Sequence, residues 1–205
     1  MSVLPESFYA RDALAVARDL LGHELVHGPV RLRITETEAY RHPGDTANHC
    51  RVGRTPRNAA MWGPPGRAYV YLCYGIHAML NLVTGRDGEG AAVLIRAAEP
   101  LGGLDVVRVR RGDLTGTDTT CLLAGPGKVG QALALDRSFS GQALFAPGGL
   151  EVRRGPGVDA VLIGPRVGVD YASPSDRLAP YRLADARSRV VSHRHSLRPL
   201  LRFSR

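Results

Sequence analysis

The stretch AYVYLCYGIHAMLNLVTGRDGEGAAVLIRA, residues 68–97, decides the fold of this chain. Three runs rich in aromatic and β-branched residues, each typical of a β-strand, alternate here with two short turns. The strand-like runs are Ala68–Tyr74, Ala78–Thr84 and Ala91–Ala97. Gly75 opens the first turn, and the glycine-rich segment 85–90 forms the second. We therefore expect three consecutive antiparallel strands, with Tyr74 at the tip of a hairpin.

The segments on either side carry helix and strand signals. Apolar residues recur at helical spacing from Arg11 to Leu21, and Gly22 follows where a helix commonly ends. A second helix is expected over Lys128–Leu135, opened by the Gly-Pro-Gly of residues 125–127, and 101–111 is a weaker helical candidate. Segment 112–120 has the composition of a solvated loop. Further extended segments are expected at Glu24–His27, Arg31–Glu38, Leu150–Val152 and Val158–Ile163.

The strand expected over Arg31–Glu38 ends in two carboxylates. Leu32, Ile34, Glu36 and Glu38 have the same parity, so the pattern predicts an apolar strand face that runs directly into acidic side chains. Glu36 is expected to share this face without taking part in chemistry.

A long segment without regular structure is expected at residues 41–66. It contains too many prolines and glycines for a helix or strand. Loops of this length in compact domains are usually functional or disordered, and the apolar Met61 and Trp62 favour an ordered one.

Length and composition predict one globular domain over residues 1–205. Of the 205 residues, 44% are hydrophobic and 22% charged, which excludes a disordered tail or a coiled coil. No run of eighteen apolar residues occurs, and the first residues lack the regions of a signal peptide. Three widely spaced cysteines, Cys50, Cys73 and Cys121, argue against a disulfide framework. We expect a protein of the reducing cytoplasm, without a membrane span.

An excess of basic residues indicates a polyanionic partner. There are 27 basic and 19 acidic residues, which gives a net charge of +8, so nucleic acids are the leading partner class. All the basic residues except Lys128 are arginines; a GC-rich genome would explain that ratio but not the net charge. The arginines between Arg182 and Arg205 predict either a surface strand with a basic tail or an edge that contacts phosphates.

Two groups of residues are candidates for chemistry. Glu38 follows a buried strand face, where a carboxylate is useful as a general base; the alternative is an ordinary salt bridge with an arginine. Tyr69 and Tyr71 share one face of the expected hairpin and would provide walls for a flat substrate, with Tyr74 as a protruding wedge. The alternative is ring packing in the core.

Other motifs give weaker evidence of a functional site. His42, His49 and Cys50 match no zinc spacing and lack a fourth ligand, so no metal is expected. The Gly-Pro-Gly-Lys of residues 125–128 is a better anion site, because a helix N-terminus presents free N–H groups and Lys128 adds charge. An ordinary helix start would have the same sequence.

Eight motifs follow one another in a characteristic order between residues 10 and 200. They are Thr37-Glu38-Ala39-Tyr40, Asn48-His49, Thr55-Pro56-Arg57-Asn58, Tyr69-Val-Tyr-Leu-Cys-Tyr-Gly75, Asn81, Val93-Leu-Ile-Arg-Ala-Ala-Glu-Pro100, Gly125-Pro-Gly-Lys128 and Arg166-Val-Gly-Val169. Together they resemble the alkyladenine (3-methyladenine) DNA glycosylase family of mammalian type. Two departures from the family pattern, a longer turn at 86–90 and Ile76-His77 after the wedge, bear on DNA contacts and lesion preference and leave Glu38 untouched.

The resemblance implies a fold and an activity. The fold would be α+β, a single mixed domain around a curved antiparallel β-sheet, with a protruding hairpin that enters the DNA minor groove. The activity would be base-excision repair of alkylated or deaminated purines in double-stranded DNA. The enzyme would flip the damaged nucleotide and hydrolyse the N-glycosidic bond, without a metal or organic cofactor.

The resemblance also implies roles for individual residues. Glu38 would be the general base for the attacking water, which Arg96 and the main-chain carbonyl of Val167 would help to hold. The remaining roles are the base pocket (Tyr40, His49, Tyr71 and Asn81), filling of the vacated stack (Tyr74) and contacts to the DNA backbone (Thr55, Arg57 and Lys128).

Two classes of function remain at this point. The first is a monofunctional glycosylase that acts as a monomer in the cytoplasm, associated with the nucleoid. The alternative is a non-catalytic damage- or nucleic-acid-binding protein on the same scaffold. A retained Glu38 favours the enzyme, because binding to phosphates does not need a buried carboxylate.

Overall fold

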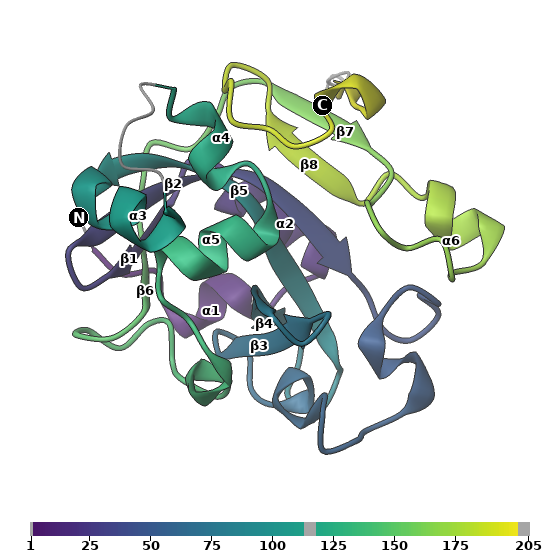
Figure 1. The fold of residues 1–205 in the computed structure, drawn as a ribbon. Coiled ribbons are helices and arrows are strands. Elements are labelled where there is room, and N and C mark those ends of the chain that lie inside the picture. The colour runs from purple at the N-terminus through teal and green to yellow at the C-terminus, as the bar shows by residue number, and fades with distance from the viewer. Residues whose placement is uncertain (1, 113–117, 201–205) are drawn as a thin grey trace.

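A nine-stranded antiparallel sheet runs through residues 2–112 and 118–200, the part of the chain that the computed structural model describes (Figure 1). The strand order is β3-β4-β5-β2-β8-β7-β9, and β1 pairs with both β2 and β6. The strands are β1 (Glu24–His27), β2 (Val30–Tyr40), β3 (Ala68–Cys73), β4 (His77–Thr84), β5 (Ala91–Gly102), β6 (Glu151–Arg153), β7 (Val161–Gly164), β8 (Arg182–Asp185) and β9 (Arg198–Pro199).

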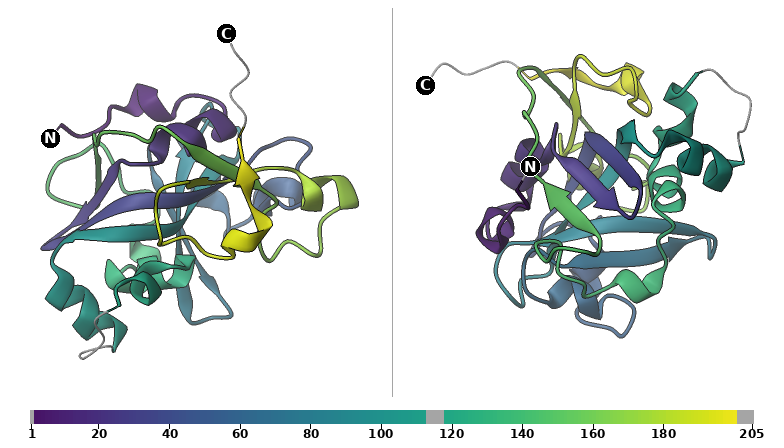
Figure 2. Two further views of the ribbon diagram at one scale, coloured as in Figure 1. Left: turned by 90° about the horizontal axis from the view of Figure 1, so that it is seen from above. Right: turned by 90° about the vertical axis from the view of Figure 1, so that its left-hand side faces the viewer.

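Short helices cover the sheet. Helices α3, α4 and α5 lie on one side and α1 and α2 on the other, as the two perpendicular views of a strongly twisted sheet show (Figure 2). The α-helices are α1 (Glu6–Tyr9), α2 (Ala13–Leu20), α3 (Leu104–Arg111), α4 (Thr120–Leu123), α5 (Pro126–Ala132) and α6 (Pro174–Leu178). The 3₁₀ turns are η1 (His49–Val52), η2 (Ala59–Trp62), η3 (Arg137–Phe139) and η4 (Arg194–Ser196). The expected α+β class is confirmed, and no helix among the described residues is long and apolar enough to cross a membrane.

The three strands expected within residues 68–97 are confirmed as β3, β4 and β5. Strand β3 pairs with β4 from Ala68–Leu82 to Cys73–His77, and β4 pairs with β5. Tyr74 and Gly75 close the hairpin with φ angles of 52° and 74°, in the left-handed region that a tight turn requires. The strands alternate strictly, so Ala68, Val70 and Leu72 pack with the main core while the tyrosines between them face away.

Helices α2 and α5 form where the sequence predicted helices, with small shifts in their bounds. The side chain of Asp12 accepts hydrogen bonds from the backbone N–H groups of Leu14 and Ala15 and so caps α2. Helix α5 begins at Pro126 rather than at Lys128, because proline suits the first helical position. It packs closely on β4: a Cβ added at Gly130 would lie 2.1 Å from the carbonyl oxygen of Ala78.

The alternation expected for β2 is wrong, and the register of the sheet explains why. Leu32 and Ile34 pack in the main core, but so does Ala39, which has the opposite parity. The pairing of β2 with β5 shifts between Ile34 and Glu36 and again between Glu36 and Thr37. Such an irregularity redirects side chains. The two carboxylates therefore lie on the side away from the apolar face rather than continuing it.

The C-terminal arginines do not all lie at the surface as expected. Arg182 is fully buried in β8, which pairs with β2 on one side and β7 on the other. Its charge is matched there by that of Glu36, which makes burial tolerable. Arg187, Arg189, Arg194 and Arg198 are exposed. Arg202 and Arg205, like the middle of the loop expected at 112–120, lie outside the described residues.

The segment 41–66 is ordered, as expected. Two 3₁₀ turns, η1 and η2, interrupt it, and buried Asn48 ties its start to the sheet region through hydrogen bonds to the carbonyl oxygens of Arg41 and Gly90. Met61 packs with Tyr69, Val83 and Ala92 on the second face of β3, β4 and β5. The loop thereby forms one wall of the cavity described next.

Candidate active site

A cavity of about 460 Å³ opens beside the hairpin β3–β4, between the end of β2 and the loops that follow η1 and β7. This volume is in the range of small-molecule sites, about 300–1,000 Å³. The cavity is lined by Tyr40, His49, Arg57, Met61, Tyr69, Tyr71, Cys73, Tyr74, Met79, Asn81, Leu94, Arg96, Pro126, Val167, Gly168, Val169 and Tyr171. Of the residues predicted to act on a base, all except Glu38 belong to this lining.

Glu38 lies directly behind the cavity wall. It is fully buried near the end of β2, and three of the lining residues donate to it. Its Oε1 accepts from the backbone N–H of Val167 at 2.8 Å and forms an ion pair with Nη1 of Arg96 at 3.2 Å. Its Oε2 accepts from the hydroxyl of Tyr40 at 2.9 Å. The structure thus places Glu38, Arg96 and Val167 together, and it adds Tyr40 to the carboxylate's partners.

Free acceptor capacity remains on this carboxylate. An ionised carboxylate offers about four lone-pair sites, two on each oxygen. The two donors to Oε1 use its sites, whereas Oε2 receives one hydrogen bond from Tyr40 among the described residues. One site on Oε2 is therefore left for a proton from another molecule.

Aromatic rings form the walls of the cavity, as the tyrosine pattern predicted. The rings of Tyr69 and Tyr71 lie 5.7 Å apart, and that of His49 meets Tyr71 edge-on at 4.6 Å. Burial raises the pKa of Tyr69 to about 12 and that of Tyr71 still higher, so both phenols keep their protons at neutral pH. These rings offer flat apolar faces of the kind that stack on a heterocycle.

His49 contributes an uncharged imidazole. Burial lowers the pKa of His49, and the nearby Arg57 and Arg51 guanidinium groups lower it further, so the ring is neutral at pH 7. Its Nδ1 lies 3.0 Å from the hydroxyl oxygen of Tyr69. Tyr40 is also neutral, because burial and the charge of Glu38 hold the pKa of Tyr40 well above its usual value.

Asn81 faces the cavity from β4. Its Nδ2 donates to the carbonyl oxygens of Tyr69 and Met79, at 3.2 and 3.3 Å. Both neighbours are pure acceptors, so the amide can only turn its NH₂ group toward them. The carbonyl oxygen of Asn81 is consequently the atom that points away from the strand backbone.

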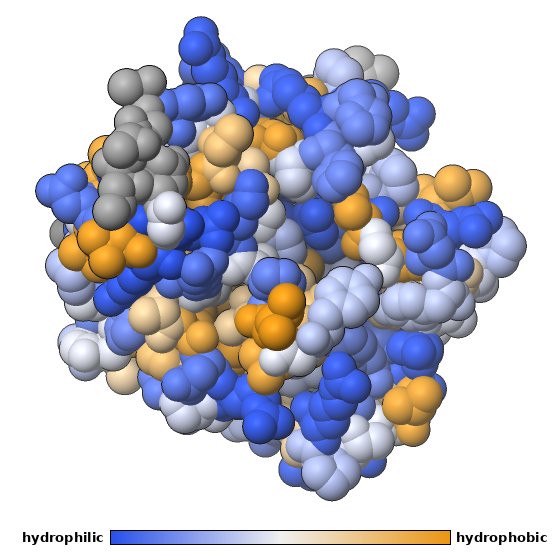
Figure 3. All heavy atoms as spheres, viewed as in Figure 1, coloured by the Kyte–Doolittle hydropathy of each residue, from blue (hydrophilic) through white to orange (hydrophobic). Residues whose placement is uncertain are grey.

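Tyr74 projects from the tip of the hairpin at the rim of the cavity. Its side chain is 92% exposed, as predicted for a wedge and not for a core residue. Ile76, on the other side of the turn, is 74% exposed. In the space-filling view apolar atoms gather over the hairpin at the centre of an otherwise mostly hydrophilic face (Figure 3).

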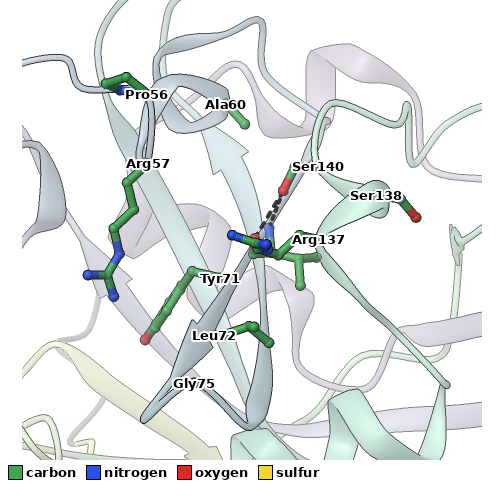
Figure 4. Close-up of a pocket in the computed structure, with 10 residues that line it drawn as sticks. Pro56, Arg57, Ala60, Tyr71, Leu72, Gly75, Arg137, Ser138 and Ser140 are labelled. Atoms are coloured by element: carbon green, nitrogen blue, oxygen red, sulfur yellow. Dashed lines mark hydrogen bonds between the residues drawn. The ribbon is translucent and has the colours of Figure 1, made fainter.

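A second hollow, of about 910 Å³, lies on the other side of β3. Figure 4 shows Arg57 reaching from the loop toward the ring of Tyr71, with Arg137 and Ser140 across the strand. Hydrogen bonds between Ser140 and the backbone of Val70 hold the η3 region against β3. Arg57 and Tyr71 line both the cavity and the second hollow, so the two are neighbours.

The three residues predicted to contact the DNA backbone come from two parts of the chain. Thr55 and the exposed Arg57 lie in the loop after η1, where Asn58 accepts from the backbone N–H of Thr55. Lys128 lies in α5, and its Nζ donates to the carbonyl oxygen of Cys121 at 2.8 Å. Pro126, in the same helix, lines the cavity, whereas Lys128 does not belong to its lining.

Several residues of the site were missed by sequence reasoning. Arg166 and Asp45 form a buried ion pair, and the Arg166 guanidinium lies 4.8 Å from the centre of the Tyr40 ring. Tyr171 lines the cavity and donates to the carbonyl oxygen of Ala47. Arg166 stands in a motif quoted above, but the sequence does not show which acid pairs with it. Within residues 2–112 and 118–200, no group of three or more His, Cys, Asp or Glu residues could hold a metal ion.

Comparisons with known proteins find relatives over most of the chain. The model of the methylpurine-DNA glycosylase family matches residues 7–189. A protein of Nitrosococcus oceani with a provisional name as a 3-methyladenine DNA glycosylase is 60% identical over 96% of each chain. An Arabidopsis thaliana DNA-3-methyladenine glycosylase is 50% identical over 98% of this chain and 78% of its own length. A similarly named protein of Methanocella arvoryzae is 47% identical over 95% of this chain and 98% of its own.

Proposed function

This chain belongs to the methylpurine-DNA glycosylase family, and from that premise we propose that it flips damaged purines out of duplex DNA and removes them with a water activated by Glu38. As a DNA glycosylase it is a DNA-repair enzyme that hydrolyses N-glycosyl bonds. The observation that carries the finer proposal is the position of Glu38: a buried carboxylate behind an aromatic cavity, with one acceptor site unused.

The reaction needs few groups. The attacking water gives a proton to Oε2 of Glu38 while its oxygen bonds to C1′ of the sugar, and the bond from C1′ to the base breaks with its electron pair on the base. An alkylated purine that already carries positive charge leaves as a neutral base, so it requires little protonation. The carboxylate also stabilises the positive charge that develops on the sugar. Arg96 and Val167 hold Glu38 through its other oxygen.

The cavity residues serve the substrate in this proposal. Tyr40, His49 and Tyr71 enclose the flipped base with neutral rings, and Asn81 lies against the purine edge where guanine carries its amino group. Tyr74 enters from the minor groove and fills the space that the base has left. Thr55, Arg57 and Lys128 contact the DNA backbone. The single domain, the monomeric state, the cytoplasmic location and the lack of a lyase step stay predictions.

A non-catalytic damage-binding protein is the competing proposal. It would use the same cavity and the same hairpin. A binding protein would gain nothing from burying an anion beside the path of DNA phosphates, which the negative charge repels. The position of Glu38 therefore favours the enzyme.

Replacing Glu38 with glutamine separates the two. Glu38→Gln keeps the shape but loses proton acceptance and negative charge, so we expect single-turnover excision to fall by at least about a hundredfold. Affinity for damaged duplex should be kept or increased. The measurement is release of abasic sites, cleaved by alkali, from oligonucleotides that each carry one lesion, beside a gel shift.

Glu99→Gln is the matched control, because Glu99 pairs with Arg33 away from the cavity. It should excise like the parent. A Glu38→Gln variant that excises as fast as the parent would place the base elsewhere. A parent that binds lesions but excises none would establish the binding protein.

A further inference from the structure

Glu38 belongs to a group of four charged side chains buried between β2, β5 and β8. Glu36, Glu38 and Arg182 are fully buried, and the Arg96 side chain is 6% exposed. Two anions and two cations balance, so the group is neutral as a whole. Buried charges are tolerated only when they are paired in this way. Arg96 joins the two halves, since it pairs with Glu36 through Nε at 3.4 Å and with Glu38 through Nη1 at 3.2 Å.

Among the described residues, Glu36 contacts Arg96, Arg182 and Ser192. Its Oε1 accepts from Nη1 of Arg182 at 2.8 Å and from the hydroxyl of Ser192 at 3.0 Å. Its Oε2 accepts from the backbone N–H of Ser192 at 2.7 Å. The Ser192 hydroxyl oxygen also accepts from Nε and Nη2 of Arg96. Glu36 and Ser192 thus fix the Arg96 guanidinium from the side opposite Glu38.

Arg182 connects the same group to the backbone that holds Glu38. Its Nε donates to the carbonyl oxygen of Pro165 at 2.8 Å, two residues before Val167, whose N–H binds Glu38. Its Nη1 also donates to the carbonyl oxygen of Ser192. Two donors hold Oε1 of Glu38, and both are anchored by this group. Glu36 and Ser192 hold the guanidinium of Arg96, and Arg182 holds the segment that carries the N–H of Val167.

We propose that Glu36, Arg182 and Ser192 are positioning residues that fix the orientation of Glu38 and balance the charge around it, through Arg96 and the 165–167 segment. The inference rests on the proposed function, in which Glu38 is the base. It departs from the expectation that Glu36 takes no part in the chemistry.

The charge balance predicts in which direction each substitution changes the protonation of Glu38. Alternate residues of a strand lie about 7 Å apart, close enough for a buried charge at Glu36 or Arg182 to act on Glu38. Without the anion of Glu36, the surplus positive charge disfavours protonation of Glu38. Without the cation of Arg182, the surplus negative charge favours protonation.

The other groups around Glu38 do not cancel these effects. From β2, Tyr40 faces it as a neutral phenol, and Tyr71 and Tyr171 are neutral as well because burial raises the pKa of each. Arg166 is a cation paired with Asp45. Among the described residues that line the same cavity, His49 is the one that gains charge in acid, and none of the variants replaces it.

The test is the dependence of single-turnover excision on pH. We expect Glu36→Gln to move the acidic limb of the profile to lower pH and Arg182→Gln to move it to higher pH, each by about one pH unit. Asp185→Asn is the matched control: Asp185 pairs with Arg33, so this pair also links β8 to β2, but it contacts neither Arg96 nor Glu38. Its acidic limb should coincide with that of the parent.

A merely structural role would not produce shifts of opposite sign. The inference is overturned if the folded Glu36→Gln and Arg182→Gln variants keep the acidic limb of the parent, or if the two limbs move in the same direction. In that case an active parent still supports the proposed function. An inactive parent would overturn the proposed function and this inference with it.

Breaking a buried ion pair is strongly destabilising, so a second variant covers failure to fold. Ser192→Ala keeps all four charges and removes the hydroxyl that joins Glu36 to Arg96. We expect excision to slow by about tenfold, with affinity for damaged duplex unchanged. Excision at the parental rate by Ser192→Ala would overturn the inference.

Discussion

Asn81 has a structural task in β4, and the proposed function gives it a selective one. Its NH₂ group is held by two backbone carbonyl oxygens of β3 and β4, which leaves the amide no freedom to flip. A rigid group at a cavity edge excludes a substrate substituent more strictly than a mobile one. If guanine-type bases enter the cavity with their exocyclic amino group toward β4, Asn81 opposes them only by steric contact, because its carbonyl oxygen would otherwise accept a hydrogen bond from that amino group.

Asn81→Ser should therefore relax discrimination against guanine-type bases. The smaller side chain leaves room for the amino group, and we expect relative excision of guanine-type over adenine-type lesions to rise by about tenfold. Competition between two labelled duplexes in one reaction measures the ratio directly. An unchanged ratio in a folded variant would show that Asn81 does not face the bound base.

At the scale of elements, the hairpin β3–β4 is built to be rigid and to protrude. Its inner face packs in the main core through Ala68, Val70 and Leu72, and α5 supports β4 through the close contact at Gly130. Its outer face carries the aromatic wall of the cavity. The packed strands thus fix the position of Tyr74 at the hairpin tip, although its own ring is exposed.

Tyr74→Ala tests the hairpin as a wedge. A ring in the place of an extruded base is worth about 1–3 kcal/mol of stacking, so the population of the flipped state should fall by about fivefold to 150-fold. The readout is the fluorescence of a base analogue at the lesion position, which reports unstacking. The melting temperature should stay within about 2 °C of the parent, since an exposed side chain contributes little to stability. A variant that unfolds would make Tyr74 a structural residue.

At the scale of the molecule, the excess of basic side chains among the described residues lies outside the buried interior. The buried arginines Arg96, Arg166 and Arg182 pair with carboxylates, and buried carboxylates outnumber them, so the positive net charge of the chain does not come from its interior. Free surface arginines are suited to phosphates, because their binding releases counterions from DNA. Association with duplex DNA should then depend little on sequence.

Salt titration checks this at the scale of the molecule. The logarithm of the affinity for undamaged duplex should fall linearly with the logarithm of salt concentration, by roughly 0.9 for each phosphate contacted. Oligonucleotides of different sequence should give parallel lines. A flat response would remove nucleic acid as the partner.

The sequence by itself determined the elements that local patterns specify. Strict alternation and turn glycines within residues 68–97 predicted the hairpin, its exposed Tyr74 and the aromatic face of β3, and helical spacing with Gly22 after it predicted α2. The ordered motifs indicated the family and named Glu38, Tyr40, His49, Tyr71, Asn81 and Arg96, and the structure brings these together.

Only the tertiary structure decided how the charged residues are paired. An irregularity in β2 turned Glu36 and Glu38 away from the apolar face, which parity alone could not show because pairing with β5 creates it. Arg182 looked like one surface arginine among several, yet it is buried against Glu36, 146 residues away in the chain. Desolvation and ion pairing depend on which strands become neighbours, and no local pattern encodes that. The chemistry proposed for Glu38 therefore depends on charges that the fold, and not the sequence pattern, selects.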